Sequence, residues 1–418
     1  MRFHAKHHAL ATVALAAITM ALAAPVPSAR ANGSSAIVDD PLLPTEHVVY
    51  TETNDTNNAI LAFHRDVAGN LTPLLGSPFA TGGAGIFDPS FKLGPFDSDQ
   101  NVVVDRDRRL LFAVNSGSNT IAVFHISARD GSLKPVKGSP FSSGGINPVS
   151  IGLRDNQIVI INQNQDPAQN VAGATSTIVT RHVAADGSIR QLPTDTTIRL
   201  PQGSSPSQAM TTSDRPFVFD AEFLGGMLDS YRLFSTGELQ ANPTEAIPAV
   251  ANVGNTAALP LGLWANPKAR QLYVGLVTVS EIGVYTWGND GLPIFERTVP
   301  LQGKAVCWIR TNSTGTRLYA SDTGSRTIDV FDTTRPDQPA PLQLAQVSGP
   351  AAIFQLGVDP TNRFVYVISQ RGSTGGAGNA LHVLAADRTG GTLTELPTSP
   401  MPIATVNPNA RPQGVAVF

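Results

Sequence analysis

The hydrophobic and polar positions of this chain follow one short pattern that returns from its beginning to its end. After a turn rich in Asp or Asn, an apolar strand leads to a small polar loop, a second strand and a Gly turn, most clearly in residues 110–133, LLFAVNSGSNTIAVFHISARDGSL. β-Branched and aromatic residues bounded by turn formers are typical of β-hairpins. The pattern predicts seven hairpins, which begin near Val48, Leu110, Gln157, Phe217, Gln271, Arg317 and Phe364.

One more short apolar strand precedes every hairpin except the first. Its equivalent residues are Val102, Ile151, Ala209, Leu263, Ile309 and Leu356, and Val415 marks a seventh such strand near the end of the given sequence. A repeat of roughly 45 to 60 residues that holds several antiparallel strands is typical of propeller blades. We therefore predict an all-β fold, a seven-bladed β-propeller over residues 47–418 with four antiparallel strands in each blade.

The two ends of this array each lack a part that the other end supplies. The first hairpin has no strand ahead of it, and the last strand, within residues 411–418, has no hairpin after it. We expect residues 411–418 to pair with the strand around Val48 to Thr51, because this pairing closes the ring and removes an exposed sheet edge.

A second set of repeated sequence motifs lies after the hairpins. GSPF occurs at residues 76–79 and again at 138–141, and TSPM at 398–401 is a fainter copy. Gly and Pro are turn formers, so each copy is interpreted as the stretch that returns the chain from an outer strand to the axis.

The N-terminus has the organisation of a secretory signal peptide. Residues 1–8 are basic, residues 9–24 form an apolar run, and Ala29-Arg30-Ala31 is an Ala-x-Ala cleavage site. The apolar run is shorter than the ~20 residues that a membrane span needs. We expect cleavage after Ala31, a short N-terminal extension over residues 32–46, no membrane anchor, and a secreted or periplasmic location.

Charge and cysteine content exclude several kinds of partner. The chain has 29 basic and 32 acidic residues, and cleavage would remove three basic ones, which leaves 29 − 3 = 26 and a net charge of 26 − 32 = −6. This balance argues against nucleic acids and anionic membranes as partners. Cys307 is the only cysteine, so no internal disulfide is possible. We expect a monomer, without a cofactor, whose partner is a small polar molecule or a lactone.

The combination of these repeated motifs resembles the pattern of a known family. G-x-L-x-P-x-x-GSPF, a Pro-led inner strand, a D-P-x-x-R-type turn and an LY-x-x-N hairpin together resemble the seven-bladed β-propeller lactonase family, which includes 6-phosphogluconolactonase-like proteins and 3-carboxymuconate cyclases. The resemblance covers nearly all of residues 47–418 and implies a lactone-ring hydrolase or cyclase. Where family members carry Pro-Arg-His this chain has Pro206-Ser207-Gln208, and where they carry Ser-Asn-Arg it has Ser321-Asp322-Thr323. Most charged residues that lactone chemistry would use are therefore replaced.

The candidate site follows from the geometry of an antiparallel blade. The start of the inner strand and the loop after the second strand lie at the same end of the axis and line one mouth. Two carboxylates, Glu222 and Asp322, occupy there the same repeat offset as Asn115. Opening a lactone needs an activated water, so these two are the candidate catalytic bases. The candidate substrate-binding residues at the same end are Asn115, Asn162, Gln208, Trp308, Gln370 and Arg371.

No metal site is expected from the sequence. The sequences around Asp97–Asp99 and Asp105–Asp107 lack the Gly and the distal Glu of a calcium loop. Two functions from different classes remain open: a weak lactone-ring hydrolase or cyclase, and a non-catalytic propeller that binds a small polar ligand or a protein partner.

Overall fold

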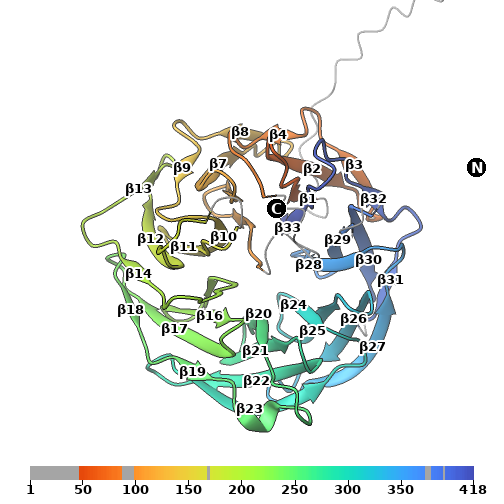
Figure 1. Ribbon diagram of the computed structural model, residues 1–418. Coiled ribbons are helices and arrows are strands. Elements are labelled where there is room, and N and C mark those ends of the chain that lie inside the picture. Colours follow the sequence, from red (N-terminus) through yellow and green to blue (C-terminus); the bar gives the residue numbers. More distant parts are fainter. Residues whose placement is uncertain (1–46, 87–97, 167–169, 372–377, 389–390) are drawn as a thin grey trace, which may run out of the picture. The chain divides into compact units, whose positions relative to one another are not determined.

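Seven antiparallel sheets surround one axis, and each of the seven predicted hairpins forms the middle of one sheet (Figure 1). This computed structural model describes residues 47–86, 98–166, 170–371, 378–388 and 391–418. All of them belong to one compact unit, residues 40–418. The predicted seven-bladed propeller is confirmed, whereas the predicted signal peptide and extension lie outside the described residues.

The first four blades each contain four main strands, which follow one another from the axis outward. Blade 1 contains β33 (Gln413–Val417), β1 (His47–Glu52), β2 (Ala59–Arg65) and β3 (Leu71–Pro73). Blade 2 contains β5 (Val102–Asp105), β6 (Leu110–Asn115), β7 (Thr120–Ile126) and β8 (Leu133–Pro135). Blade 3 contains β10 (Pro148–Arg154), β11 (Gln157–Asn162), β12 (Thr177–Val183) and β13 (Ile189–Arg190). Blade 4 contains β15 (Met210–Thr211), β16 (Phe217–Glu222), β17 (Met227–Leu233) and β18 (Leu239–Ala241).

The remaining three blades follow the same order. Blade 5 contains β20 (Pro260–Ala265), β21 (Gln271–Leu276), β22 (Glu281–Trp287) and β23 (Pro293–Pro300). Blade 6 contains β24 (Val306–Thr311), β25 (Arg317–Asp322), β26 (Thr327–Asp332) and β27 (Ala340–Gln346). Blade 7 contains β28 (Ala352–Val358), β29 (Phe364–Gln370), β30 (Ala380–Ala386) and β31 (Leu393–Glu395). One turn of 3₁₀ helix, η1 (Ala249–Ala251), lies between blades 4 and 5.

Five blades carry a second outer segment that pairs with the same third strand as the first. These segments are β4 (Phe79–Ala80), β9 (Phe141–Ser142), β14 (Thr197–Arg199), β19 (Glu245–Ala246) and β32 (Met401–Pro402). Three of these segments begin at the repeated motifs, two at GSPF and one at TSPM. The chain therefore adds a second outer segment to the blade before it returns to the axis. In each copy the Ser hydroxyl accepts a hydrogen bond from the third strand where the outer ladder is interrupted: Ala62 N to Ser77 Oγ at 3.0 Å, Val123 N to Ser139 Oγ at 2.8 Å, and Val383 N to Ser399 Oγ at 3.1 Å.

The hydrophobic core lies between neighbouring blades. Because side chains alternate between the two faces of a strand, each sheet packs apolar residues against the blade before it and the blade after it. Phe112 of blade 2, for example, belongs to one buried cluster with Ile151 and Ile160 of blade 3. The inner strands come close together: a Cβ added at Gly262 would lie 2.3 Å from the Cys307 carbonyl oxygen. Blade-to-blade packing thus replaces a single central core.

The ring closes as predicted. β33 pairs antiparallel with β1, and Val49 lies opposite Val417. Phe418 N donates to Val48 O at 2.9 Å, and Val48 N donates to Phe418 O at 3.2 Å. The last strand of the chain is therefore the inner strand of the first blade.

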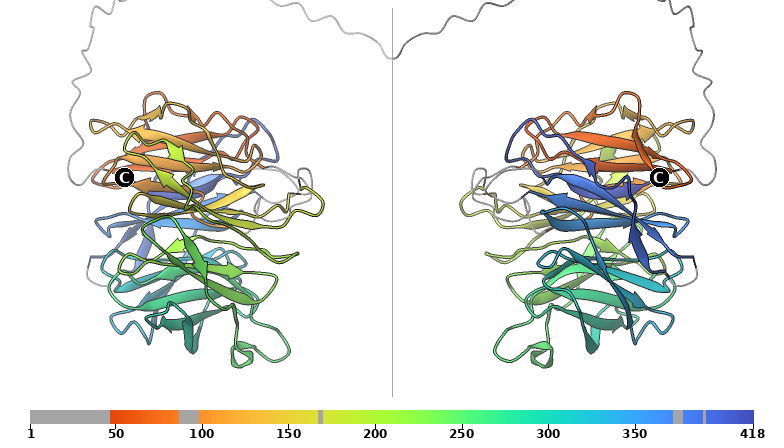
Figure 2. Two further views of the ribbon diagram at one scale, coloured as in Figure 1. Left: turned by 90° about the vertical axis from the view of Figure 1, so that its left-hand side faces the viewer. Right: turned by 90° about the vertical axis from the view of Figure 1, so that its right-hand side faces the viewer.

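The two ends of the axis differ in the parts of the blades that they present, and Figure 2 shows the blades from the side. At one end the inner strands begin and the second strands finish, and we name it the Glu222 end. At the other end the inner strands turn into the second strands, and we name it the Trp264 end. Among the described residues there is no helix long and apolar enough to cross a bilayer.

Residues 98–101 cross the axis. The Ser98 carbonyl oxygen accepts from Gln355 Nε2 of blade 7 at 2.7 Å, and Asp99 pairs with Arg310 of blade 6. On the other side, Asp99 N donates to Ser207 O of blade 4 at 3.2 Å. A segment bonded to inner strands on opposite sides of the ring lies across its centre, and Figure 1 shows this part of the chain running into the middle.

Candidate functional site

The two predicted catalytic carboxylates stand at equivalent places in different blades. Glu222 ends β16, Asp322 ends β25 and Asn115 ends β6, so the predicted repeat offset is confirmed. Blade 5 separates the blades of Glu222 and Asp322. Within the described part of the chain, no hydrogen bond or ion pair joins Glu222 to Asp322, and each carboxylate has its own surroundings.

Glu222 belongs to a cluster of three buried carboxylates in blade 4. Asp220 and Glu222 are two residues apart on β16, so they share one face of the sheet. Asp229 lies directly opposite Asp220 on β17. One carboxylate oxygen of each residue lies within 4.8 Å of those of the other two.

Backbone amides hold two of these carboxylates. Ser205 N donates to Glu222 Oε2 at 2.6 Å. Ser207 N and Gln208 N donate to Asp220 Oδ1 at 2.9 and 3.0 Å. These bonds fix the start of the inner strand of blade 4 against β16, and they leave Asp220 Oδ2 and Glu222 Oε1 without a donor among the described residues.

Burial and mutual repulsion oppose ionisation in this cluster. Burial raises the pKa of Glu222 to about 7, and the charge of Asp229 adds to the rise. Burial and the charges of Glu222 and Asp229 hold the pKa of Asp220 well above its ordinary value. Burial also raises the pKa of Asp229. A carboxyl with a pKa near 7 exchanges its proton at neutral pH, which suits acid–base chemistry.

Asp322 has a different partner and a different protonation state. Its Oδ2 accepts from Thr327 Oγ1 at 3.1 Å. Burial, followed by the charge of Asp329, raises the pKa of Asp322 to about 9. At neutral pH this carboxyl is protonated, so its environment suits a proton donor better than the predicted base.

The amides predicted to bind substrate are buried and bonded within the protein. Asn115 Oδ1 accepts from Thr81 Oγ1 at 2.6 Å, and Gln370 Nε2 donates to Pro412 O at 2.8 Å. Gln208 Nε2 donates to Gln100 Oε1 at 2.8 Å and so holds the segment that crosses the axis. Asn162 donates to Thr177 Oγ1 at 3.3 Å. These amides tie blades and loops together, and their binding role stays a prediction.

The last two predicted binding residues, Trp308 and Arg371, have different surroundings. Trp308 is fully buried in the core of blades 5 to 7, so a ligand cannot reach it without movement of the blades. Arg371 is half-buried, and its guanidinium donates to Thr405 Oγ1 at 2.8 Å and to the carbonyl oxygens of Asn407 and Ala410 at 3.2 Å. Arg371 thus holds the loop that leads into β33.

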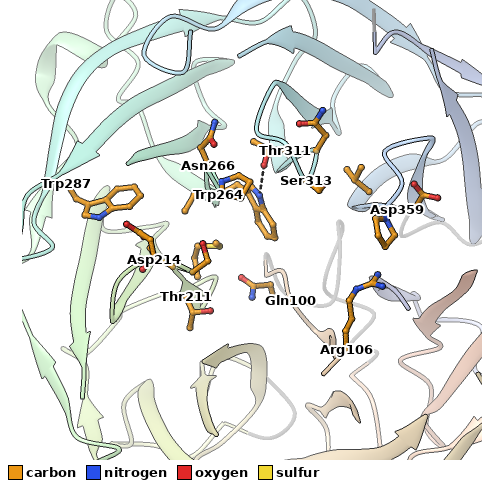
Figure 3. A pocket seen from close by; sticks show the side chains of 18 residues that line it. Gln100, Arg106, Thr211, Asp214, Trp264, Asn266, Trp287, Thr311, Ser313 and Asp359 are labelled. Carbon is orange, nitrogen blue, oxygen red and sulfur yellow. Dashed lines mark hydrogen bonds between the residues drawn. The ribbon is translucent and has the colours of Figure 1, made fainter. Parts of the chain in front are cut away.

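The structure places a cavity of about 410 Å³ at the opposite end, the Trp264 end of the axis. Figure 3 shows Trp264 beside its centre, with Gln100, Arg106, Asp214 and Asn266 around it. The walls come from the turns after the inner strands of blades 2, 4, 5, 6 and 7. Gln100, from the segment that crosses the axis, also lines it.

Trp264 is held in one orientation. Its Nε1 donates to Thr311 Oγ1 at 3.0 Å, and the Arg310 guanidinium lies 4.1 Å from the ring centroid. Arg310 is itself paired with Asp99. The indole is therefore a preorganised part of the wall.

The rim of the cavity is polar and carries charges of both signs. Hydroxyl and amide side chains line it, namely Thr211, Thr212, Ser213, Asn266, Thr311, Asn312 and Ser313. Arg106 is exposed, and one of its nitrogens donates to Val417 O at 2.5 Å. Asp359 is neutralised by Arg65 at 2.8 Å. The cavity thus offers hydrogen-bonding groups, an aromatic wall and a cation to a ligand.

A chain of Ser, His and Glu in blade 7 resembles a hydrolytic triad in its distances. His382 Nε2 lies 3.0 Å from Ser369 Oγ, and His382 Nδ1 lies 2.7 Å from Glu395 Oε1. Ser369 Oγ, however, donates its proton to Gly378 O at 2.6 Å, so it accepts from the imidazole. Burial alone would raise the pKa of Glu395, but hydrogen bonds from His382, Ser399 and Ser348 lower it to about 2. His382 thus bridges Ser369 and Glu395 in a buried hydrogen-bonded chain, and Ser369 is not poised as a nucleophile.

Sequence reasoning missed Asp220, Asp229 and the cavity at the Trp264 end. The alternation of FVFDAE at residues 217–222 does place Asp220 on the face of Glu222, and the hairpin register then brings Asp229 opposite. For the cavity the signal was weaker, because Trp264 and Arg106 stand near the ordinary turns that follow inner strands.

Comparison with known proteins supports the fold. The chain matches no protein-family model and no curated protein sequence. Among solved structures it is similar to the periplasmic gluconolactonase PpgL of Pseudomonas aeruginosa, with a TM-score of 0.69 and 16% identity over 89% of this chain and 99% of that one. It is also similar to a provisionally assigned 6-phosphogluconolactonase of Bacteroides uniformis, with a TM-score of 0.65 and 16% identity over 90% of this chain and 100% of that one.

Sequence identities of 16% show a shared fold and nothing further. The ring of seven blades, its closure by β33 and these structural neighbours agree with one another. In its fold, this chain is therefore a seven-bladed β-propeller similar to those of these solved structures.

Proposed function

We propose that this propeller binds a small polyhydroxylated ligand, of the sugar-acid or sugar-lactone class, in the cavity at the Trp264 end. The observation that carries the proposal is the preorganised indole of Trp264 in the wall of a 410 Å³ cavity with a hydroxyl and amide rim. This volume is near the lower end of the ~300 to 1,000 Å³ that ligand pockets usually have. It suits a ligand of about the size of one sugar ring.

The chemistry of the rim narrows the ligand class. Hydroxyl and amide side chains both donate and accept hydrogen bonds, as do the hydroxyl groups of a sugar. An aromatic ring provides a flat apolar surface for the C–H face of a ring-shaped ligand. Arg106 adds a charge-assisted hydrogen bond for a carboxylate. The names of the structural neighbours, which refer to gluconolactone and its phosphorylated form, point to the same class of compound.

The test is a binding assay with gluconate, glucose and benzoate by calorimetry. Wild-type protein should bind gluconate more tightly than glucose, and benzoate least. Arg106→Met should weaken gluconate binding by about 10- to 100-fold, the value of one charge-assisted hydrogen bond, and leave glucose binding unchanged. Trp264→Ala should weaken both.

Arg109→Met is the matched control, because Arg109 lies three residues along the same turn and does not line the cavity. It should bind all three compounds as the wild type does. If no sugar or sugar acid binds at millimolar concentration, or if binding survives both cavity substitutions, this site is not the binding site.

Lactone hydrolysis at the Glu222 end is the second candidate function. Glu222, with its pKa of about 7, favours it, since a general base works best when its pKa is near the working pH. A location outside the cytoplasm belongs to the same proposal. The predicted leader supports it, and so does the structural neighbour that is named as periplasmic.

For this candidate we expect hydrolysis of unphosphorylated sugar lactones, followed by pH-stat titration, to rise with pH and level off above about 7, as Glu222 ionises. Glu222→Gln keeps the size of the side chain but cannot accept the proton, so the rate should fall by about 10² to 10⁴. Asp322→Asn should have the smaller effect, because Asp322 is protonated at neutral pH. Robust turnover in the Glu222→Gln variant would exclude this residue from the mechanism. If the wild type shows no turnover, only the proposed binding function remains.

A further inference from the structure

We propose that Asp220, Glu222 and Asp229 bind a hard divalent cation, Ca²⁺ in the first place, at the Glu222 end of blade 4. The proposal goes beyond both candidate functions, and its test measures binding and stability rather than turnover. It rests on the geometry of three carboxylates and on two buried oxygen atoms that have no hydrogen-bond donor among the described residues.

The distances within the cluster fit ligands of one ion. One oxygen from each carboxylate lies within 4.8 Å of the other two. Protein oxygens bind Ca²⁺ at 2.3 to 2.6 Å, so two ligands of the same ion are at most about 5 Å apart. All three ligands are carboxylate oxygens, a set that suits Ca²⁺, Mg²⁺ or Mn²⁺ and does not suit softer metals.

The hairpin itself holds the three groups together. Asp220 and Asp229 are direct cross-strand partners, and like charges in that position repel each other. Within the described residues, no Lys or Arg forms an ion pair with any of the three. Any negative charge that the cluster carries is therefore not neutralised by a basic side chain of the described residues.

Two oxygen atoms of the cluster lack a partner. Asp220 is 0% exposed and Glu222 is 6% exposed, and neither Asp220 Oδ2 nor Glu222 Oε1 receives a hydrogen bond from the described residues. A buried polar atom without a partner carries its full desolvation penalty. A cation bound between the carboxylates would satisfy both oxygens at once.

Blade 6 provides an internal comparison. Asp322 and Asp329 occupy there the places of Glu222 and Asp229, but Ala320 stands where blade 4 has Asp220. Two carboxyls can share one proton, and burial together with the charge of Asp329 raises the pKa of Asp322 to about 9. Asp220 is thus the addition that turns a pair of carboxylates into a set of three.

The experiment uses the full chain, stripped with EDTA and transferred to metal-free buffer at pH 7.5, a choice near the pKa of Glu222. Calorimetric titration with CaCl₂ should show one site. The Tm should rise by about 2 to 5 °C at a concentration roughly 100 times the Kd, and KCl at equal ionic strength should not reproduce the rise.

The variants separate this site from others. Asp220→Asn should abolish the heat of Ca²⁺ binding and the Tm shift, and it should raise the Tm of the metal-free protein because it removes a carboxyl whose ionisation the folded protein opposes. If this variant does not fold, Glu222→Gln serves in its place. Asp322→Asn, the matched control in blade 6, should keep the full response.

Three outcomes would overturn the proposal. The first is no heat and no Tm shift with Ca²⁺, Mg²⁺ or Mn²⁺. The second is a response that persists in Asp220→Asn. The third is a loss of stability with rising pH that saturating Ca²⁺ does not remove. Carboxyls whose pKa is higher in the folded than in the unfolded protein make the free energy of unfolding fall as pH rises through about 7. Such a loss in the presence of Ca²⁺ would show that protons alone neutralise the cluster.

Discussion

A protein that lacks residues 411–418 should lose most of its folding stability, which for a domain is typically ~5 to 15 kcal/mol. This segment is the inner strand of blade 1, and its backbone pairs with β1 from Val49 to Glu52. Val415 and Val417 are buried in the cluster that joins blade 1 to blade 7. Without them, β1 becomes an open sheet edge and the seam of the ring has no inner strand.

Thermal unfolding followed by circular dichroism checks this expectation. The truncated protein should melt far below the full chain or not fold at all. A synthetic peptide with the sequence of residues 411–418, RPQGVAVF, should restore part of the lost stability when it is added in excess. A truncated protein that keeps the Tm of the full chain would show that the ring does not depend on its closing strand.

Arg65→Met should destabilise the protein by about 3 to 5 kcal/mol, the usual effect of removing one partner of a buried ion pair. Arg65 and Asp359 are both fully buried, and Arg65 Nη2 lies 2.8 Å from Asp359 Oδ2. Arg65 Nε also donates to Tyr366 OH at 3.1 Å, and the guanidinium lies 4.7 Å from the Phe364 ring centroid. Arg65 belongs to blade 1 and the other three residues to blade 7 or its turn, so the substitution opens the same seam and leaves Asp359 unpaired.

Urea unfolding gives the measurement. Arg65→Met combined with Asp359→Asn should recover part of the loss, because the unpaired charge is then gone. Arg190→Met is the control: Arg190 pairs with Asp186 at 3.2 Å on the surface, and we expect no measurable change from its loss. A loss in Arg65→Met no larger than that of Arg190→Met would mean that this pair does not stabilise the seam.

Much of the fold could be read from the sequence because propeller blades are local structures that repeat. The hairpin of each blade, the extra strand before it and the unmatched pieces at the two ends all follow from patterns within about 60 residues. The repeated GSPF motifs were recognised in the sequence. Only the structure showed that their Ser hydroxyls accept hydrogen bonds from backbone amides of the third strand.

The sites were less predictable. The offset of Glu222 and Asp322 was correct, but their separation by a blade and their different partners depend on contacts across strands. The buried amides were expected to face a ligand, yet several bond to residues more than 40 positions away in the sequence, as Gln208 does to Gln100. Such pairs leave no local pattern.

The sequence by itself determined the number of blades, their strands, the closing strand and the end of each blade at which Glu222, Asp322 and Asn115 stand, because hydrophobic alternation and turn residues act over short distances. Only the tertiary structure decided that residues 98–101 cross the axis, that Asp220 and Asp229 join Glu222, and that the turns of five blades enclose a cavity around Trp264. The crossing segment and the cavity arise where segments far apart in the chain meet, and closure of the ring brings these segments together. The three carboxylates instead share one hairpin and depend on its cross-strand register.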